Sequence, residues 1–379
     1  MSPRPGGLQS RPMTTTIHLS GPADMLAVLP YQLGFHPRDC LVVVSLHGRR
    51  MGLVQRIDLP PPEHVRDAVA AMIGPLLQDE PAAVLLIGFE EREGESRPML
   101  DEMTAVCTAS EIEINDRMVV RGGRWFDLDC DLDCCPPEGL ELPAPSEVPA
   151  VAEFVGRGVC PLPDRSALAD RVEIHSPLST RAVSTLAGEW LELRREATDD
   201  GQVELSEREQ GLRECRASEI AVWSRVLCDE DHAEPIQALP PQDLAMLAVS
   251  LTDVDLRDAL IAWLCPGTLP PELIDPVLCQ QVSGALPAPA WLDRDRGDAE
   301  QVMALQRMEH RLCDLCAALP DEWAVSSLTV LASFTWWRGD GALTRIALDR
   351  ALRIDPHYRL AQLLERMVDM AIRPERATA

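Results

Sequence analysis

A change in the spacing of apolar residues near residue 145 limits the folds open to this chain more than any other feature. Before it, short β-branched runs alternate with stretches whose apolar residues recur every three or four positions, which are the patterns of buried strands and of helices. We expect strands at residues 16–20, 40–46, 52–59, 82–89 and, as a hairpin, 118–128, and helices at residues 22–33, 62–77 and 96–109. Because a hairpin makes antiparallel neighbours, the pattern predicts an α/β domain with a mixed sheet and flanking helices in two or three layers.

The chain becomes almost wholly helical in its second part. The proline-rich stretch PPEGLELPAPSEVP, residues 136–149, has no apolar periodicity and is interpreted as a boundary. Helical spacing follows at residues 179–197, 216–227, 243–252, 253–264 and 299–319. The sequence therefore predicts a disordered tail at residues 1–12, an α/β domain at residues 13–145 and an all-α domain at residues 146–379.

Charge and composition exclude several classes of protein. The formal charge of −26 repels phosphate, so we expect no binding to nucleic acid and none to an anionic membrane surface. The 379 residues contain no lysine. A phosphate-binding loop of the Walker type, a pyridoxal Schiff base and a protein kinase all require a lysine, so these activities are excluded in their usual form.

The expected location is the cytosol. The first residues, MSPRPGGLQSRP, lack the apolar segment of a signal peptide, and no run of about 18 apolar residues is present. In a reducing compartment the 12 cysteines are expected to be buried thiols or metal ligands rather than a disulfide framework.

Cys130, Cys134 and Cys135 lie in the stretch CDLDCCPPEG, directly after the predicted strand RWFDL. Zinc is the metal that such thiols would bind, and it usually takes four ligands. Only three thiols are local, so a fourth ligand would have to come from a set elsewhere in the chain, namely Cys107, Cys40 or His36. The stretch is interpreted as a turn with inert thiols, a metal site or a redox site.

Negative charge beside these thiols bears on the choice. Four aspartates flank them: Asp127, Asp129, Asp131 and Asp133. Neighbouring carboxylates are expected to raise the pKa of a thiol and so to disfavour a redox nucleophile. A bound divalent cation would offset that repulsion by its own charge.

The segment GDGALTRIALDRALRIDP, residues 339–356, resembles the second helix of a tetratricopeptide repeat. Asp340 is expected to cap this helix, Ala351 to permit close helix approach and Pro356 to end it. The preceding VSSLTVLASFTWWRG supplies a first helix, so a tetratricopeptide-like hairpin is predicted. Trp336 and Trp337 should lie on opposite sides of that helix, with at least one exposed, and they are the predicted site for a protein partner.

Two further groups of polar residues have side chains that could bind a metal or another ligand. His310, Cys313 and Cys316 recur every three residues, as metal ligands on a helix would, but they share that helix with an apolar stripe, so core packing is expected. Glu90 and Glu91 follow the strand AAVLLIGF, at the edge where open α/β sheets bind ligands. Asp127 and His47 are the neighbours expected there.

The chain as a whole resembles the family described as domain of unknown function 4192. The segments that carry the resemblance are LPYQLGFHPRDCLVVVSL, CDLDCCPPEG and WWRGDGALTRIALDRALRIDPHYRLAQLL, which occur in this order. The resemblance implies a lysine-poor cytosolic protein of high-GC Gram-positive bacteria, and it implies no activity, substrate or catalytic residue.

The sequence leaves three functions open. The first is a non-catalytic interaction or scaffold protein that binds a partner through its C-terminal helices. The second is a metal- or thiol-dependent enzyme whose site is the Cys130–Cys135 loop, with zinc as the cofactor. The third, a nucleotide or phosphate-ester hydrolase that uses acidic residues and Mg²⁺, would need carboxylates to converge at the edge of the sheet.

Overall fold

The computed structural model describes residues 19, 21–48, 50–130, 132, 134–198, 205–228, 233–286, 288–293 and 297–372. The predicted tail at residues 1–12 lies outside this set. Of the predicted strand at residues 16–20 only Leu19 is described, and it belongs to no strand. Among the described residues, no helix combines the length and the apolar character needed to cross a membrane.

A six-stranded mixed sheet forms the N-terminal part, which confirms the predicted fold class. Its strands are β1 (Cys40–His47), β2 (Arg50–Asp58), β3 (Ala83–Phe89), β4 (Glu113–Arg121), β5 (Arg124–Asp127) and β6 (Leu140–Glu141), in the order β2-β1-β3-β4-β5-β6. Only β3 and β4 are parallel, and the other neighbouring strands are antiparallel.

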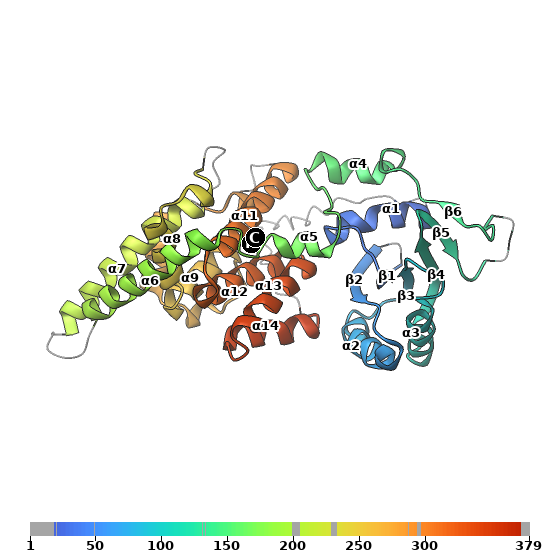
Figure 1. Ribbon diagram of the computed structural model, residues 1–379, viewed down its shortest axis with the longest axis horizontal. Helices are drawn as coiled ribbons and strands as arrows, with labels where there is room; N and C mark the ends of the chain where they lie inside the picture. Colours follow the sequence, from blue (N-terminus) through green and yellow to red (C-terminus); the bar gives the residue numbers. More distant parts are fainter. Residues whose placement is uncertain are drawn as a thin grey trace, which may run out of the picture.

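Helices cover both faces of this sheet (Figure 1). The helix α1 (Pro22–Leu33) packs on one face, and α2 (Val65–Gln78) with α3 (Arg97–Ala109) packs on the other. Side chains of a strand alternate between its two faces. In β1, therefore, Leu41 and Val43 contact α2 and α3, whereas Val42 and Val44 face α1. Burial on both faces explains why this strand is an almost continuous apolar run.

The hairpin between β4 and β5 turns at two glycines, as predicted. Gly122 and Gly123 have φ values of +58° and +75°, in the left-handed region that other residues rarely adopt. Two central residues of this conformation suit the right-handed twist of paired strands. The turn aligns Val119 with Phe126 and Val120 with Trp125, which fixes the position of the chain that follows β5.

Eleven further helices are described after the sheet. They are α4 (Pro149–Gly156), α5 (Arg165–Asp170), α6 (Pro177–Thr198), α7 (Leu205–Val226), α8 (Pro241–Ser250), α9 (Val254–Leu264), α10 (Pro276–Ala285), α11 (Asp298–Ala318), α12 (Asp321–Arg338), α13 (Gly341–Ile354) and α14 (Arg359–Asp369). From α5 onward they share one apolar core, in which Trp223, Leu260 and Phe334 are fully buried. Figure 1 shows α6 and α7 side by side at the end of the molecule away from the sheet.

The chain directly after α1 joins the sheet to the helices. Gly34 ends α1 with a φ of +79°, as expected for a C-cap glycine. The next residue, Phe35, lies in the helical core and forms a parallel bridge with Leu162. The helix α4 packs on α1, where Phe154 contacts Tyr31 with ring centroids 5.6 Å apart. The division of the chain into domains at residue 145 stays a prediction.

The helices α12 and α13 form a tight antiparallel pair. Asp340 caps α13 by accepting a hydrogen bond from the backbone N–H of Leu343 at 3.0 Å, as predicted. The hydroxyls of Thr335 and Thr344 hydrogen-bond across the pair at 2.8 Å, and Ala351 is fully buried. The pair is a helical hairpin, and its assignment as a tetratricopeptide repeat stays a prediction.

Candidate functional site

The thiol loop, residues 128–139, is held at both ends by the sheet. The chain returns from the loop as β6, which places Leu140 opposite Trp125 of β5. The Arg124 guanidinium donates hydrogen bonds to the carbonyls of Glu138 and Gly139 at 2.8 and 2.7 Å. Gly139 has a φ of +73°, and a Cβ there would lie 2.7 Å from the Phe126 ring of β5, so the position favours glycine. The cysteines therefore lie on a loop anchored to a regular element.

The three predicted metal ligands lie together in this loop. The Sγ atoms of Cys130 and Cys134 are 3.7 Å apart, those of Cys134 and Cys135 are 3.9 Å apart, and all three lie within 4.8 Å of one another. A zinc–sulfur bond is about 2.3 Å long, which places two sulfurs at corners of a zinc tetrahedron about 3.8 Å apart. Two of the three separations match that spacing.

Hydrogen bonds shift the pKa values of Cys130 and Cys135 in opposite directions. The backbone of Leu132, and then the thiols of Cys135 and Cys134, lower the pKa of Cys130, although the charge of Asp127 acts in the opposite direction. The pKa of Cys135 is raised to about 12, mainly because of its hydrogen bond with Cys130. The charge of Asp127 raises the pKa of Cys130, as the sequence predicts, but the net shift of that pKa is downward. Hydrogen bonds at contact distance outweigh the more distant charge.

One of the flanking aspartates, Asp129, is paired with an arginine. Asp129 accepts two hydrogen bonds from Nε of Arg117, at 3.1 and 3.0 Å, and a further one from Nη2. Its backbone N–H donates to Asp127 at 2.9 Å. The charge of Asp129 is therefore balanced by an arginine of β4. Asp131 and Asp133 lie outside the described residues.

A cavity of about 560 Å³ adjoins the thiol loop. Cys130 and Cys135 line it, together with apolar side chains that include Trp125, Phe126, Leu128, Leu132, Pro136 and Leu140, and polar and apolar atoms share its surface almost equally. Asp127 is the only carboxylate among its described lining residues. This volume is in the range of pockets that bind small molecules.

A fourth ligand for the thiols is not found among the described residues. Cys107 is buried in the core between the sheet and α3, and Cys40 is buried on the opposite face beneath α1. His36 follows Phe35 at the joint, where its backbone N–H donates to the carbonyl of Leu162. In the described part of the chain, the group therefore offers three protein ligands and leaves one tetrahedral corner open.

Glu90 has a structural role at the end of β3. Its carboxylate accepts hydrogen bonds from the backbone N–H groups of Gly94 and Ser96 at 3.1 and 2.9 Å, and from the Ser96 hydroxyl and Arg121, each at 2.7 Å. Burial raises its pKa, but these hydrogen bonds, those of Ser96 first, outweigh burial and lower it. The carboxylate thus stabilises the loop between β3 and α3, and these hydrogen bonds make it less available as a magnesium ligand.

His47 lies at the opposite edge of the sheet from Glu90, so the expectation that they are neighbours is wrong. The strand β1 is antiparallel to β3 and places Cys40, at its start, beside Phe89. At the far end of β1, His47 contacts Asp79 at 2.9 Å, and the Ser45 hydroxyl donates to the same carboxylate. Both side chains bind the aspartate, so histidine does not lie between serine and aspartate as a catalytic triad requires.

Of the second group, Cys313 and Cys316 belong to the core, as expected, but His310 does not. Cys313 and Cys316 are each 1% exposed and pack among the apolar residues of the helical part, whereas His310 is exposed. Burial raises the pKa of both thiols, that of Cys316 to about 12. They behave as small apolar side chains.

The two tryptophans of α12 are both buried, so the expectation that at least one is exposed is wrong. Trp336 is 7% exposed and donates a hydrogen bond from Nε1 to the carbonyl of Ile372 at 2.9 Å. Trp337 is 9% exposed and stacks on Phe334. The chain after α14 and the core cover the two rings. Partner binding at these residues stays a prediction.

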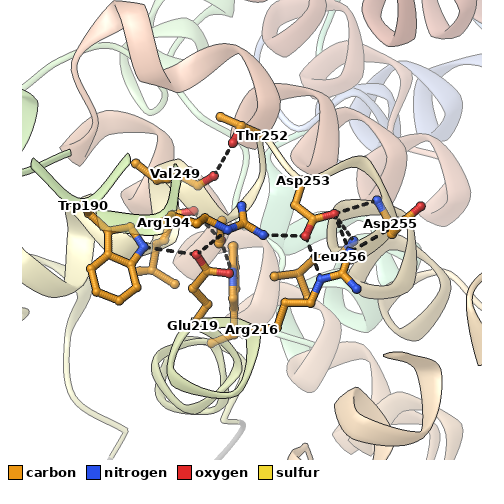
Figure 2. Close-up of polar contacts among 12 residues, drawn as sticks. Trp190, Arg194, Arg216, Glu219, Val249, Thr252, Asp253, Asp255 and Leu256 are labelled. Atoms are coloured by element: carbon orange, nitrogen blue, oxygen red, sulfur yellow. Dashed lines mark hydrogen bonds and ion pairs between the residues drawn. The ribbon is translucent and has the colours of Figure 1, made fainter. Parts of the chain in front are cut away.

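A buried charge network joins α6, α7 and the start of α9 (Figure 2), and no sequence pattern predicted it. Glu219 is fully buried, accepts a hydrogen bond from the Trp190 indole at 3.1 Å and lies 3.5 Å from Arg194. Asp253 accepts from Arg194 and from both Nε and Nη2 of Arg216, the latter two at 2.7 and 2.9 Å.

The network fastens the helical hairpin of α6 and α7 to the N-terminus of α9. Asp253 also caps α9, where its carboxylate accepts from the backbone N–H groups of Asp255 and Leu256. Burial raises the pKa of Glu219 to about 7, and Arg194 opposes this only in part. In the sequence, the sole signal was a four-residue spacing between Trp190 and Arg194 within one helix, and no local pattern connects them to Asp253.

Fold and site together define a class: a protein with a mixed sheet between helical layers, a long helical region and a loop of three clustered thiols. The sequence profile of the family described as a domain of unknown function (DUF4192) matches residues 22–272 and 279–375. The chain belongs to this family, as its resemblance predicted. Comparisons with curated proteins and with solved structures each found no match.

Proposed function

We propose that this protein binds one zinc ion through Cys130, Cys134 and Cys135 and that its function depends on this metal. The observation that carries the proposal is the spacing of the three sulfurs, 3.7 and 3.9 Å between successive Sγ atoms, which is the edge of a zinc–thiolate tetrahedron. Thiolates select zinc over the hard cations calcium and magnesium, which prefer oxygen. The proposed location is the cytosol, where thiols stay reduced.

The arrangement of the three thiols favours a catalytic zinc ion over a structural one. Structural zinc sites are usually closed by four protein ligands, whereas catalytic sites have three and keep one position open. The described residues supply three, and a cavity adjoins two of them. A metal-dependent activity at the thiol loop is therefore the form of function that we propose first.

Zinc affinity should depend on the clustered thiols alone. We expect Cys134→Ser to weaken zinc binding by about a hundredfold or more, because one of three thiolates is lost. The matched control is Cys160→Ser, an exposed cysteine outside the cluster, which should leave the affinity unchanged. Competition with a chromophoric chelator, using reduced protein, measures both. Equal affinities for wild type and Cys134→Ser would contradict the proposal.

A second candidate function is the binding of a protein partner by the last helices. Leu363, Met370 and Ile372 are 46, 44 and 43% exposed, and the last of these lies beside Trp336. Leu363 lies on α14 and Met370 is the C-cap residue of that helix, seven residues further on, which is the spacing that an amphipathic partner helix contacts. We propose such a helix from another protein as the occupant.

Replacement of Leu363 and Met370 by serine should leave the free energy of unfolding within about 1 kcal/mol, because neither side chain belongs to the buried core. It should remove a protein that co-purifies with the wild-type chain. The matched control is Leu193→Ser, at a position of α6 that is 56% exposed. A co-purifying protein retained by the double variant, or lost equally from the control, would contradict this second function.

A further inference from the structure

The thiol group adjoins a cavity of mixed polar and apolar lining, and this contact limits what can bind there. Cys130 and Cys135 line the cavity, whereas Cys134 is not among its described lining residues. A ligand in the cavity would thus reach the metal from the side of two sulfurs. Binding of such a ligand presupposes the proposed zinc site.

Charge restricts the ligand to a neutral donor. Three thiolates around Zn²⁺ leave a net charge of −1, and Asp127 adds a carboxylate to the same cavity. An anionic donor would be repelled by both. A protonated amine has no free lone pair for the metal. An uncharged nitrogen donor binds zinc well and adds no further charge to the cavity.

The side chains of the wall favour an aromatic body. Trp125 and Phe126 contribute aromatic rings, and Leu128, Leu132 and Leu140 contribute aliphatic side chains. The Arg121 guanidinium lies over the Phe126 ring, 4.7 Å from its centroid, and helps to fix that ring. Leu132 is 70% exposed and provides apolar surface that a ligand could cover.

We propose that the open coordination position binds a small, uncharged aromatic nitrogen heterocycle, whose ring nitrogen coordinates the metal and whose apolar body fills the cavity. The ligand displaces a metal-bound water, and no covalent or redox step is involved. The cavity volume of about 560 Å³ admits such a molecule with a substituent on its ring.

The test uses the full chain loaded with Co²⁺, whose visible absorption reports both the thiolates and the fourth ligand. The probes are imidazole, 1-benzylimidazole and benzoate. We expect 1-benzylimidazole to change the ligand-field bands at about tenfold lower concentration than imidazole, because its phenyl ring is buried in the cavity. Benzoate, an anion of similar size, should leave the bands unchanged.

A variant ties the effect to the cavity wall. Leu132→Ser should reduce the advantage of 1-benzylimidazole to less than about threefold, because apolar contact is lost. The matched control is Leu77→Ser on α2, also an exposed leucine, which should keep the full advantage. Equal binding of the two azoles, or binding of benzoate, to protein that shows sulfur-to-cobalt charge transfer would overturn this inference and leave the metal site standing. Absence of that charge transfer would overturn the metal site and the inference with it.

Discussion

Arg350→Met is expected to lower the free energy of unfolding by about 3–5 kcal/mol. The Arg350 side chain is 1% exposed and donates to the carbonyls of Val172 and Cys316, the latter at 3.0 Å, and to Asp321 at 2.8 Å. It thus joins α13 to the segment after α5, to α11 and to α12. Methionine fills similar space but leaves two buried carbonyls without a donor.

The control is Arg353→Met, one turn further along α13. Arg353 is 63% exposed and pairs with Glu173 at 2.7 Å, so its loss should cost no more than about 1 kcal/mol. Urea unfolding followed by circular dichroism measures both variants. Similar losses for the two would mean that the buried hydrogen bonds of Arg350 add little to stability.

Glu219→Gln is expected to remove a pH-dependent loss of stability. The pKa of Glu219 is about 7 in the fold, because of burial, and 4.5 is its ordinary value. A raised carboxyl pKa means that the fold favours the protonated form. This contribution is fully present below pH 4.5 and is lost as pH rises to about 7. The free-energy difference between the variant and the wild type should change in favour of the variant by about 3 kcal/mol across that interval.

Glutamine keeps an acceptor for the Trp190 indole, and Arg194 keeps its contact with Asp253. The control is Glu214→Gln, an exposed position of the same helix, which makes the same change in charge. Unfolding free energies at pH 4.5, 5.5, 6.5 and 7.5 give the comparison. A constant difference between Glu219→Gln and wild type over this range would show that the buried carboxyl does not titrate as expected.

The strands and the thiol group were predictable because their signals are local. The run CLVVVSL is short and apolar, the glycine pair forms the β4–β5 turn, and the three cysteines lie within six residues of one another. Local spacing cannot give strand order, however, because that depends on which distant segments pair. The position of His47 at the edge opposite Glu90 follows from the antiparallel pairing of β1 with β3, and no residue in either strand predicts that pairing.

Features made by distant contacts were mispredicted or missed. Helical spacing places Trp336 and Trp337 on different sides of α12, but it does not show that the chain after α14 covers one side and the core the other. In the same way, the local sequence around Glu219 and Asp253 does not distinguish them from acidic residues on the surface. Only the packing of α6, α7 and α9 makes them partners of buried arginines.

Elemental analysis of reduced protein, purified anaerobically without a metal-binding tag, is the decisive experiment for the metal site. We expect about one zinc per chain, lost from Cys134→Ser and from Cys135→Ser and retained by Cys160→Ser. Protein without metal, which takes up no zinc when it is supplied and whose 12 thiols all titrate on denaturation, would contradict the proposed site.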